Sequence, residues 1–391
     1  MYEYDSRKIK PGAIFLCLPR AEAYCEEAKS NGAKDIISCT REQMATIAND
    51  FYKSPSKGLK VVGVTGTNGK SSVTSFVHQA LTNLGENSYL QGTLSARLTT
   101  PESLDSIQSM RKHLDSGGTH FVMEVSSHGI HQNRILGIDF DVKCLTNISQ
   151  DHLDYHDTFE SYKAVKLSYM IDFLGTSIFP EEFNRYSCIE NNYVFGAFNQ
   201  ENLKAAYAIL LHLGYDDSRC RESLKNVRCP EGRFEFIDIN NVCNVVVDYA
   251  HSPDGIKVVA REAKLLAKKH KGKLFVCFGC GGDRDRSKRA KMATEAAKQA
   301  DFLMITQDNP RNEDPKQIVD DILSGIPDTV KYKVVHDRQL AIENVLALAS
   351  ANDVVLIAGK GHEDYQIIGS DRHYFKDKDV VLNWHNKQTI L

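Results

Sequence analysis

Runs of apolar residues and stretches of helical spacing alternate along most of this 391-residue chain. Short runs rich in β-branched residues are typical of buried strands, whereas apolar residues that recur every three or four positions indicate a helix packed on one face. From residue 59 onward the strand-like runs lie at 61–64, 120–125 and 142–148, with amphipathic segments between them. This alternation predicts a mostly parallel sheet with helices on both faces.

The same pattern indicates a separate unit at the start of the chain. Residues 1–57 have strand-like runs at 13–18 and 35–38 and a helical stretch at 21–31, which predicts a small α/β unit. A polar segment with serine, lysine and proline at 53–58 then predicts a linker.

A second α/β series begins after a pause near residue 230. Its strand-like runs lie at 245–247, 274–278, 302–305 and 354–357, each followed by a helical stretch. The predicted fold class is therefore α/β with three domains. They are a small N-terminal α/β domain (1–57), a central parallel-sheet domain (58–230) and a Rossmann-like C-terminal domain (231–391).

Composition narrows the class of protein. Hydrophobic residues make up 42% of the chain and charged residues 25%, as in soluble globular proteins. The formal net charge of −3 gives no support for a nucleic-acid surface. No apolar run approaches the roughly 18 residues of a membrane span, and the charged opening segment is unlike a signal peptide. We therefore expect a cytoplasmic protein.

The ten cysteines are scattered, and several stand in apolar runs. Cys277 and Cys280 form a C-x-x-C pair at the end of a predicted strand, but no second pair completes a zinc motif. We favour buried, reduced thiols over a zinc or redox site.

A glycine-rich loop, G-T-N-G-K-S-S, follows the strand at 61–64 and opens a helix. Strand, glycine turn and helix N-terminus together predict a phosphate-binding loop, because backbone N–H groups and the helix dipole attract an anion. Lys70 would neutralise phosphate oxygens and Ser71 would ligate Mg²⁺. An ordinary glycine turn is the alternative. The loop is a variant, since Val64 stands where the general pattern has glycine and Gly63 comes one position early.

Polar clusters also follow the other predicted strands, at the edge where open α/β sheets bind ligands. Glu124 can complete a Mg²⁺ site or merely cap the next helix. The loop 146–156 holds several histidines and acids, which fits metal binding beside a phosphate loop or a solvated turn. Arg233 and Asp248 suit a phosphate and a ribose hydroxyl, or else a surface salt bridge.

Three clusters in the C-terminal domain carry several charges each. They lie at 279–289, 308–315 and 359–363, each after a predicted strand. The first is a charged glycine turn that suits a second anion site, although a lone glycine-rich loop is weak support. The other two place cations beside carboxylates, as a zwitterionic, amino-acid-like ligand requires.

In their order along the chain, these motifs resemble those of the Mur ligases. The motifs are G-T-N-G-K-S-S, T-T-P, M-E-V-S-S-H, T-N-I-S-Q-D-H-L-D-Y-H, Y-K-A-V-K, F-N-Q-E-N, G-R-F-E, D-Y-A-H-S-P-D, F-G-C-G-G-D-R-D, D-N-P-R-N-E-D-P and G-K-G-H-E-D-Y-Q. The resemblance is to the type that adds the third peptide residue in peptidoglycan precursor synthesis. It implies an ADP-forming ligase whose three domains bind the UDP-sugar, ATP and the incoming amino acid.

The resemblance also implies roles for residues on the ATP side. The nucleotide would be bound by Gly66, Thr67, Asn68, Gly69, Lys70, Ser71, Ser72, Asn147, Asn202, Arg233 and Asp248. Mg²⁺ would be held by Ser71, Glu124, His152 and Lys166, and the catalytic residues would be Lys70, Glu124, His152 and Lys166. Lys166 resembles the lysine that family members carbamylate to N6-carboxylysine, whereas its sequence context alone favours a solvated helix residue.

Two further groups of residues match substrate-binding positions of the family. The UDP-muramoyl dipeptide would be held by Ser6, Thr99, Thr100, Ser126, Gln132 and Arg134. The amino acid would be held by Arg289, Asp308, Asn309, Arg311, Gly359 and Glu363. Arg311 favours meso-diaminopimelate over L-lysine, because a guanidinium can pair with the distal carboxylate that lysine lacks.

The implied mechanism is phosphorylation of the D-glutamyl carboxylate by ATP, followed by attack of the amine on the acyl phosphate. The alternatives are the same chemistry with L-lysine or another acceptor, and a non-catalytic nucleotide-binding regulatory module. Two regions, the N-terminal unit and the stretch between Lys166 and Gly196, are shorter than the family usually has. We expect a monomer without a nucleic-acid partner.

Overall fold

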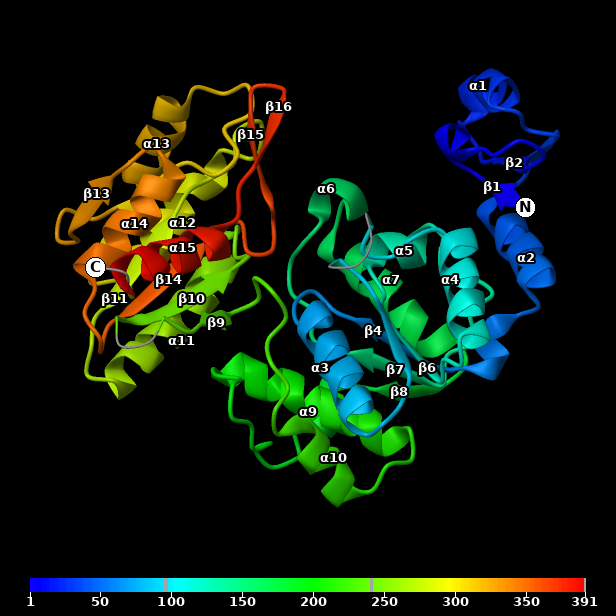
Figure 1. The fold of residues 1–391 in the computed structure, drawn as a ribbon, viewed down its shortest axis with the longest axis horizontal. Coiled ribbons are helices and arrows are strands. Elements are labelled where there is room, and N and C mark those ends of the chain that lie inside the picture. Colours follow the sequence, from blue (N-terminus) through cyan, green and yellow to red (C-terminus); the bar gives the residue numbers. More distant parts are fainter. Residues whose placement is uncertain (94–97, 240–241, 390–391) are drawn as a thin grey trace. The chain divides into compact units, whose positions relative to one another are not determined.

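The computed structural model describes residues 1–93, 98–239 and 242–389 (Figure 1). These residues form two compact units. The first comprises Met1–Asn192 and Phe198–Val227, and the second comprises Tyr193–Ala197 and Arg228–Leu391. The short segment Tyr193–Ala197 thus belongs to the second unit although residues of the first unit follow it in the chain.

The first unit begins with a three-stranded parallel sheet. Its strands β1 (Tyr2–Glu3), β2 (Ile14–Cys17) and β3 (Asp35–Ser38) lie in that order, beside the helix α1 (Cys25–Ser30). The expected helix at 21–31 is therefore shorter, because a 3-10 turn precedes it. The helix α2 (Arg41–Tyr52) follows, and Thr40 and Gln43 form a capping box at its start.

The main sheet of the first unit has five parallel strands in the order β5-β6-β4-β7-β8. These strands are β4 (Lys60–Thr65), β5 (Ser88–Gln91), β6 (His120–Glu124), β7 (Val142–Leu145) and β8 (Thr176–Ile178). Because β4 lies between β6 and β7, the loops that follow these three strands leave the same edge of the sheet. The parallel sheet expected from the apolar runs is confirmed.

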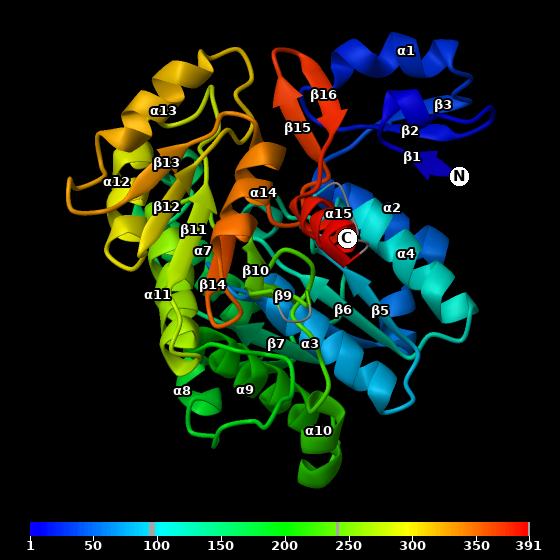
Figure 2. The ribbon, with the colours of Figure 1, turned by 60° about the vertical axis from the view of Figure 1, so that its left-hand side comes forward.

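The helices of the first unit after β4 lie against this sheet or against one another, and Figure 2 shows several of them. They are α3 (Lys70–Asn83), α4 (Ser103–Asp115), α5 (Ser127–His131), α6 (Leu153–His156), α7 (Phe159–Asp172), α8 (Pro180–Phe183), α9 (Ala197–His212) and α10 (Asp217–Leu224). One core cluster joins Leu16 and Met44 of the N-terminal segment to residues of α4, α7 and the main sheet. This shared core places residues 1–57 in the same unit as the main sheet, and the predicted domain boundaries stay a prediction.

The second unit is built on a six-stranded sheet in the order β13-β12-β11-β14-β10-β9. Its strands are β9 (Glu235–Ile237), β10 (Asn244–Asp248), β11 (Leu274–Phe278), β12 (Phe302–Ile305), β13 (Tyr332–Val334) and β14 (Val354–Ala358). All neighbours pair in parallel except β9, which is antiparallel to β10. Strand β11 separates β12 from β14, which matters for the loops described below.

Five helices and a hairpin complete the second unit. The helices are α11 (Pro253–Lys269), α12 (Ser287–Ala297), α13 (Pro315–Leu323), α14 (Arg338–Leu348) and α15 (Asp377–Thr389), and the hairpin is β15 (Tyr365–Ile368) with β16 (Asp371–Tyr374). On one face of the sheet, residues of α14 and α15 pack with Val245, Val355 and Ile357 in a core cluster of their own. The expected Rossmann-like α/β architecture of this part is confirmed.

Candidate active site

The glycine-rich loop connects β4 to α3, as the sequence predicts, and its glycines have steric reasons. Gly66 has φ 150° and Gly69 has φ 86°. A Cβ on Gly66 would lie 1.8 Å from Thr146 Oγ1, and a Cβ on Gly69 would lie 2.4 Å from Asn202 Oδ1. The backbone of the loop therefore approaches its neighbours too closely for any side chain at these two positions.

Residues after β7 fix the shape of this loop. The amide of Asn68 donates to Asn147 Oδ1 at 3.0 Å, and Asn147 Nδ2 donates back to Asn68 O at 3.1 Å. The amide of Thr67 donates to Asn147 O at 2.9 Å. Lys70 Nζ donates to the carbonyls of Gly66 and Thr67 at 2.8 and 2.9 Å, so the ammonium lies over the loop. The loop is preorganised, with a cation at the centre.

Gly63, the glycine that stands one position early, lies inside β4. A Cβ there would lie 2.0 Å from the hydroxyl of Tyr169 and 2.6 Å from Phe140 Cε1. Its small size therefore serves the packing of α7 against the sheet.

Ser71 and Glu124 form a buried pair beside the loop. Ser71 Oγ donates to Glu124 Oε2 at 2.9 Å, and the amide of Thr93 donates to Glu124 Oε1 at 2.8 Å. The carboxylate lies at the end of β6, so it does not cap the helix that follows, whose N-cap is Ser126. A hydroxyl and a carboxylate oxygen are ligands that Mg²⁺ prefers, so this pair fits the ion.

Lys166 is buried, contrary to the solvated position that its sequence context favoured. Its side chain reaches from α7 to the carbonyl of Gly66, with Nζ to O at 2.9 Å, and Thr65 Oγ1 lies 3.4 Å away. Nζ also lies 4.9 Å from the centre of the Tyr162 ring. Burial, and next the positive charge of Lys70, lower the pKa of Lys166 to about 6.

His152 is half exposed and begins α6 with a left-handed backbone, φ 52°. Its ring packs edge-on against His128, with ring centroids 4.9 Å apart. Within the residues that the structure describes, no group of three or more His, Cys, Asp or Glu side chains is arranged to hold a metal ion. His152 therefore remains a predicted ligand, without a preformed cluster around it.

Asn202 is buried on α9, and its Oδ1 faces Gly69. Its Nδ2 donates to Asn199 Oδ1 at 3.2 Å. Asn202, which is predicted to bind the nucleotide, thus approaches the phosphate-loop backbone from a different helix.

The predicted dipeptide-binding residues of the first unit lie along one chain of hydrogen bonds. Thr100 Oγ1 donates to Ser126 Oγ at 3.0 Å. Arg134 donates to Thr100 O at 3.1 Å and to Gln132 Oε1 at 2.6 Å. Thr99 Oγ1 lies 3.1 Å from Thr93 Oγ1, next to the Glu124 carboxylate. The structure therefore brings together five of the six predicted residues of this group, all except Ser6.

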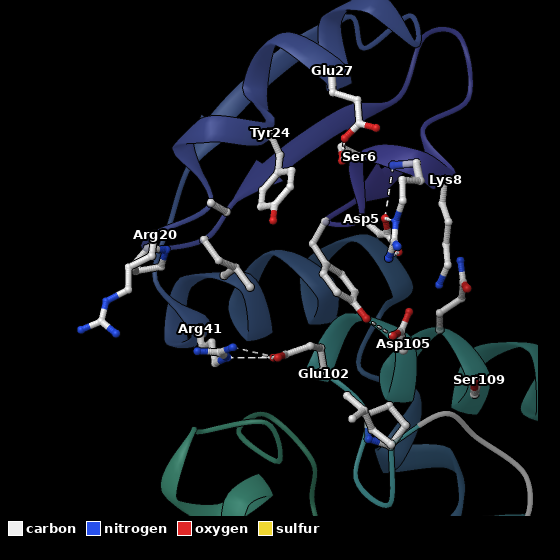
Figure 3. Close-up of a pocket in the computed structure, with 18 of the residues that line it drawn as sticks. Asp5, Ser6, Lys8, Arg20, Tyr24, Glu27, Arg41, Glu102, Asp105 and Ser109 are labelled. Carbon is white, nitrogen blue, oxygen red and sulfur yellow. Dashed lines mark hydrogen bonds and ion pairs between the residues drawn. The ribbon is translucent and has the colours of Figure 1, made fainter. Parts of the chain in front are cut away.

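Ser6, the remaining residue predicted to hold the UDP-muramoyl dipeptide, lines a pocket of about 880 Å³ between the small sheet and α4 (Figure 3). Its hydroxyl donates to Glu27. Lys8, Arg20 and Arg41 also line the pocket, and Arg41 pairs with the buried carboxylate of Glu102 at 2.9 Å. The pocket is large enough for a nucleotide-sized ligand, and carboxylates such as Glu27 and Glu102 line it together with these cations.

Arg233 and Asp248 lie near each other in the second unit. Asp248 is buried at the end of β10 and accepts hydrogen bonds from the amides of Phe234 and Ala250, both at 2.7 Å. Burial raises its pKa to about 6. The Arg233 guanidinium stacks over the Tyr249 ring at 4.7 Å.

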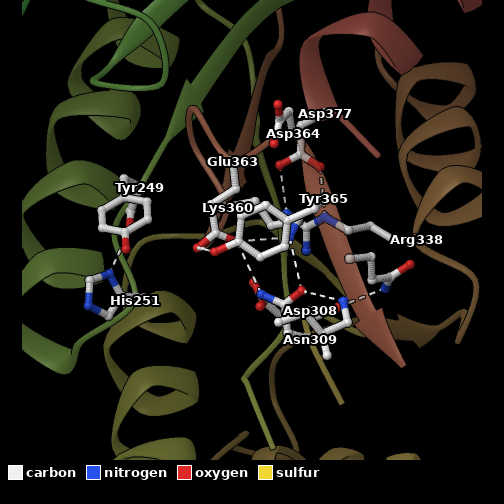
Figure 4. Close-up of polar contacts among 12 residues, drawn as sticks. Tyr249, His251, Asp308, Asn309, Arg338, Lys360, Glu363, Asp364, Tyr365 and Asp377 are labelled. Carbon is white, nitrogen blue, oxygen red and sulfur yellow. Dashed lines mark hydrogen bonds and ion pairs between the residues drawn. The ribbon is translucent and has the colours of Figure 1, made fainter. Parts of the chain in front are cut away.

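The loops after β12 and β14 bring four predicted amino-acid-site residues together (Figure 4). Asn309 Nδ2 donates to Glu363 Oε2 at 3.1 Å. A Cβ on Gly359 would lie 3.0 Å from Asp308 Oδ2, so the two loops are close. Lys360, fully buried, donates to Glu363 Oε2 at 3.0 Å and to Asn309 Oδ1 at 3.3 Å.

Arg311 is held by both its backbone and its side chain. Its backbone, with φ 52°, bonds to the hairpin, since its amide donates to Ile367 O at 3.1 Å and its carbonyl accepts from the Gly369 amide at 2.8 Å. Its NH1 donates to Gly282 O at 2.8 Å, which leaves further N–H groups of the guanidinium for a ligand.

Arg289 is placed differently from the other predicted amino-acid-site residues. Its guanidinium is fully buried and pairs with Glu313 at 2.7 Å and with Asp321 at 2.8 Å. The hydrogen bonds from Arg289 lower the pKa of the Glu313 carboxyl to about 2. Its role as a direct contact with the amino acid stays a prediction.

Cys277 and Cys280 are buried, free thiols. Burial raises the pKa of both to about 12, which makes them poor nucleophiles and poor metal ligands.

Sequence reasoning missed several residues that shape these sites. Tyr162 shares a hydrogen bond of 2.9 Å with Thr67 Oγ1, and Lys360 links Asn309 to Glu363. Tyr162 stands four positions before Lys166, a spacing that places two side chains on one helix face and gave a usable signal. Thr93 bonds to Glu124 from a loop with no motif, so nothing in its sequence context pointed to it.

Two family models match the chain. The model for the Mur ligase middle domain covers residues 64–181, and the model for the Mur ligase glutamate ligase domain covers residues 232–361. The chain belongs to the Mur ligase family. The expected family, fold class and ATP-dependent ligase class are therefore confirmed.

Curated relatives match over nearly the whole chain. A UDP-N-acetylmuramoyl-L-alanyl-D-glutamate–2,6-diaminopimelate ligase from Pseudomonas putida is 36% identical over 462 aligned positions, covering 95% of this chain and 92% of the relative. The enzyme of the same name from Trichormus variabilis is 38% identical, covering 86% of this chain and 79% of the relative. Since 462 aligned positions exceed the 391 residues of this Mur ligase, it lacks internal segments that the P. putida enzyme has.

Solved structures agree with this assignment. A UDP-N-acetylmuramoyl-L-alanyl-D-glutamate–2,6-diaminopimelate ligase has a TM-score of 0.65 and 28% identity, covering 99% of this chain and 95% of that one. A MurF ligase from Thermotoga maritima in complex with ADP has a TM-score of 0.68, covering 99% of this chain and 97% of that one; at 14% identity it shows the shared fold alone. Within the described residues, no helix is both long enough and apolar enough to cross a membrane.

Proposed function

We propose that this Mur ligase uses ATP to join meso-2,6-diaminopimelate to UDP-N-acetylmuramoyl-L-alanyl-D-glutamate. The observation that carries the proposal is the set of Asp308, Asn309 and Glu363 gathered at two strand ends, with Arg311 beside them. Carboxylates for an ammonium group and a guanidinium for a distal carboxylate suit this amino acid. Relatives at 34–38% identity are named for the same reaction.

The proposed reaction has two steps, phosphoryl transfer and amide formation. A D-glutamyl carboxylate oxygen attacks the γ-phosphorus of ATP, the bond to the β,γ-bridging oxygen breaks, and ADP leaves from an acyl phosphate. The amine nitrogen of the amino acid then attacks the acyl carbon, loses a proton and expels inorganic phosphate. Lys70 and the loop amides neutralise charge on the transferring phosphoryl group, which is the main contribution a protein makes to such a step.

Mg²⁺ is the cofactor that this chemistry implies. Ser71 and Glu124 fit the ion, and we propose His152 and a carbamylated Lys166 as further ligands. When bound, Mg²⁺ supplies charge neutralisation to the phosphate oxygens. Carbamylation would turn the Lys166 amine into an anionic oxygen ligand beneath the loop.

The other predicted residues take their family roles in this proposal. The nucleotide would be bound by Gly66, Thr67, Asn68, Gly69, Ser72, Asn147, Asn202, Arg233 and Asp248, and the UDP-muramoyl dipeptide by Ser6, Thr99, Thr100, Ser126, Gln132 and Arg134. The pocket around Ser6 supports a nucleotide-sized ligand there. We also propose that the enzyme acts as a cytoplasmic monomer, which light scattering after gel filtration tests.

One assay separates the candidate functions. The protein is incubated with Mg-ATP, the UDP-muramoyl dipeptide and either diaminopimelate or L-lysine, and product mass and phosphate release are measured. A product only with diaminopimelate supports the proposal. Preferential use of lysine would instead support a lysine-adding ligase. If neither amino acid gives more phosphate release than a Lys70→Met control, the protein is a non-catalytic nucleotide-binding module.

A further inference from the structure

A buried ion pair outside every motif connects the two loops of the amino-acid site. Arg338 is the first residue of α14 and Asp377 the first of α15, and both side chains are fully buried. Arg338 Nε donates to Asp377 Oδ1 at 2.7 Å, and NH2 donates to Oδ2 at 2.8 Å (Figure 4). This bidentate geometry fixes the plane of the guanidinium.

The remaining donors of Arg338 point at the backbone of both loops. NH1 donates to the carbonyl of Gln307 at 3.2 Å, and NH2 donates to the carbonyl of Ala358 at 3.1 Å. Gln307 immediately precedes Asp308, and Ala358 immediately precedes Gly359. One side chain therefore holds the residue before each of the two substrate-binding loops.

These two loops come from strands that are not neighbours, because β11 lies between β12 and β14. The chain after β12 crosses the end of β11 at Gly279, where a Cβ would lie 2.3 Å from Thr306 O and 2.9 Å from the Asp308 amide nitrogen. At their far ends the loops are connected through the hairpin, because Arg311 bonds to Ile367 O and to the Gly369 amide, and Asn309 Oδ1 accepts from the Ile367 amide at 2.9 Å. Arg338 connects the starts of the two loops through their backbone carbonyls, and Lys360 connects the side chains of Asn309 and Glu363.

The position of the pair argues for more than stability. Taking two charges out of water is costly, and well-packed apolar residues can often replace a buried ion pair without loss of stability. An apolar pair could not donate to Gln307 O and Ala358 O, however, so those carbonyls would lose their donor.

We propose that Arg338 is a positioning residue for the amino-acid site and that Asp377 fixes its orientation, an inference that rests on the proposed function. It sets the distance between the 308–311 and 359–363 loops, so that Asp308 and Glu363 face one ligand. Arg338 itself does not touch the substrate.

The test uses the double variant R338M/D377L in the full chain, which avoids leaving one buried charge unpaired. We expect the KM for diaminopimelate to rise about 10- to 100-fold while the KM for ATP changes less than about twofold. Arg338→Lys keeps the charge but supplies one ammonium in place of the planar fork, so it should recover only part of the affinity.

The matched control is Asp353→Asn, at the opposite end of β14. Asp353 accepts hydrogen bonds from the amides of Lys273 and Ser350 at 2.7 and 2.8 Å, and it lies in the same unit. If Asp353→Asn has a thermal stability similar to that of the double variant, it should keep the wild-type KM for diaminopimelate. Equal changes in the control and the double variant, or an equal rise in the KM for ATP, would assign Arg338 a purely structural role.

Hydrogen exchange in the absence of substrates gives a readout that does not depend on the proposed function. We expect faster exchange at 306–311 and 358–363 in the double variant, with unchanged exchange at 60–72. If the wild type does not use diaminopimelate, the proposed function fails, and the exchange data alone decide whether Arg338 positions the loops. Unchanged exchange in both loops would overturn the inference.

Discussion

At the scale of a single residue, Arg311 is the side chain that we propose selects the amino acid. Its guanidinium has one bond to Gly282 O, and its backbone is fixed by the hairpin, so its remaining donors are held in place before a ligand arrives. Preorganisation of this kind lowers the cost of binding a carboxylate. The position of Arg311 in the D-N-P-R motif was predicted from the sequence, whereas the hairpin that holds it was not.

Arg311→Ala should therefore weaken diaminopimelate selectively. Loss of charge-assisted hydrogen bonds worth about 1.5–3 kcal/mol corresponds to a fall of roughly 10- to 150-fold in kcat/KM for diaminopimelate. The small activity with L-lysine, if measurable, should change less. Competition assays with both amino acids give the ratio, and an equal loss for both would remove Arg311 from this role.

Lys166 makes a chemical prediction at the same scale. Its amine lies buried beneath the phosphate loop, 2.9 Å from Gly66 O, and we propose that it carries a carbamate. Lys166→Ala should lose at least about 100-fold in kcat, because it removes an anionic metal ligand. Short carboxylates such as acetate or propionate should restore part of that activity in the variant and none in Lys70→Met, and failure of rescue at any concentration would argue against the carbamate.

Glu313 and Arg289 predict how stability depends on pH. Pairing lowers the pKa of Glu313 from its ordinary 4.5 to about 2, so the pair stabilises the folded state above pH 4.5 and this contribution is lost as the pH falls toward 2. Glu313→Gln should thus be less stable than wild type at pH 7, by about 1.5–3 kcal/mol for lost hydrogen bonds to a charged group, because Arg289 keeps its pair with Asp321. Urea unfolding should show that the difference shrinks steadily between pH 4.5 and 2, and a constant difference would contradict the assignment.

At the scale of elements, β7 and α7 are coupled by a buried lysine. Lys143 Nζ donates to Met170 O at 2.9 Å and also to Phe173 O, so it satisfies carbonyls at the end of the helix that carries Lys166. Burial lowers the pKa of Lys143. The strand thus anchors one end of the helix, while Tyr169 against Gly63 sets its distance from the sheet.

Lys143→Met should leave those carbonyls without a donor at a cost of about 1–3 kcal/mol. Hydrogen exchange should accelerate in the last turns of α7, at residues 166–172, and not in α3. Urea unfolding measures the overall loss, and Lys60→Met, which removes the exposed pair with Asp141, is the matched control because surface pairs contribute little. Equal effects of the two variants would show that Lys143 has no special role.

Elements with a strong local pattern were predicted, and those that depend on distant partners were not. The strands β11 and β12 occupy the residues that the apolar runs indicated. The predicted strand at 142–148 ends at Leu145, because Thr146 and Asn147 turn to the phosphate loop. The hairpin β15–β16 was missed because β15 is only four residues long and half-buried, and the residues of β16 are exposed and mostly polar.

The residues of the candidate site likewise fall into those that a local motif predicted and those that only the fold brings together. Gly66, Gly69 and Lys70 are readable from the sequence because their function depends on one short loop. Arg338 and Asp377 are 39 residues apart and meet only through the packing of α14 and α15, so no local sequence pattern predicts their contact.

At the scale of the whole molecule, the described residues form two units with separate core clusters. Separate cores predict two transitions in calorimetry, since each unit can lose its packing on its own. Diaminopimelate at about 100 times its Kd should stabilise the second unit alone, by about 2.7 kcal/mol. A single transition, or an equal shift of both, would contradict this prediction; hydrogen exchange assigns each transition to its unit.

The segment Tyr193–Ala197 has a consequence for how such ligases can be recombined. It belongs to the second unit, where the Arg228 guanidinium lies 4.0 Å from the Tyr193 ring and the Ala197 amide donates to Glu262 at 2.9 Å. A gene fusion that exchanged residues 228–391 for those of another ligase would leave this segment behind with mismatched neighbours. Viable chimaeras would have to exchange both segments together, so the structural unit that can be exchanged includes residues outside the contiguous C-terminal sequence.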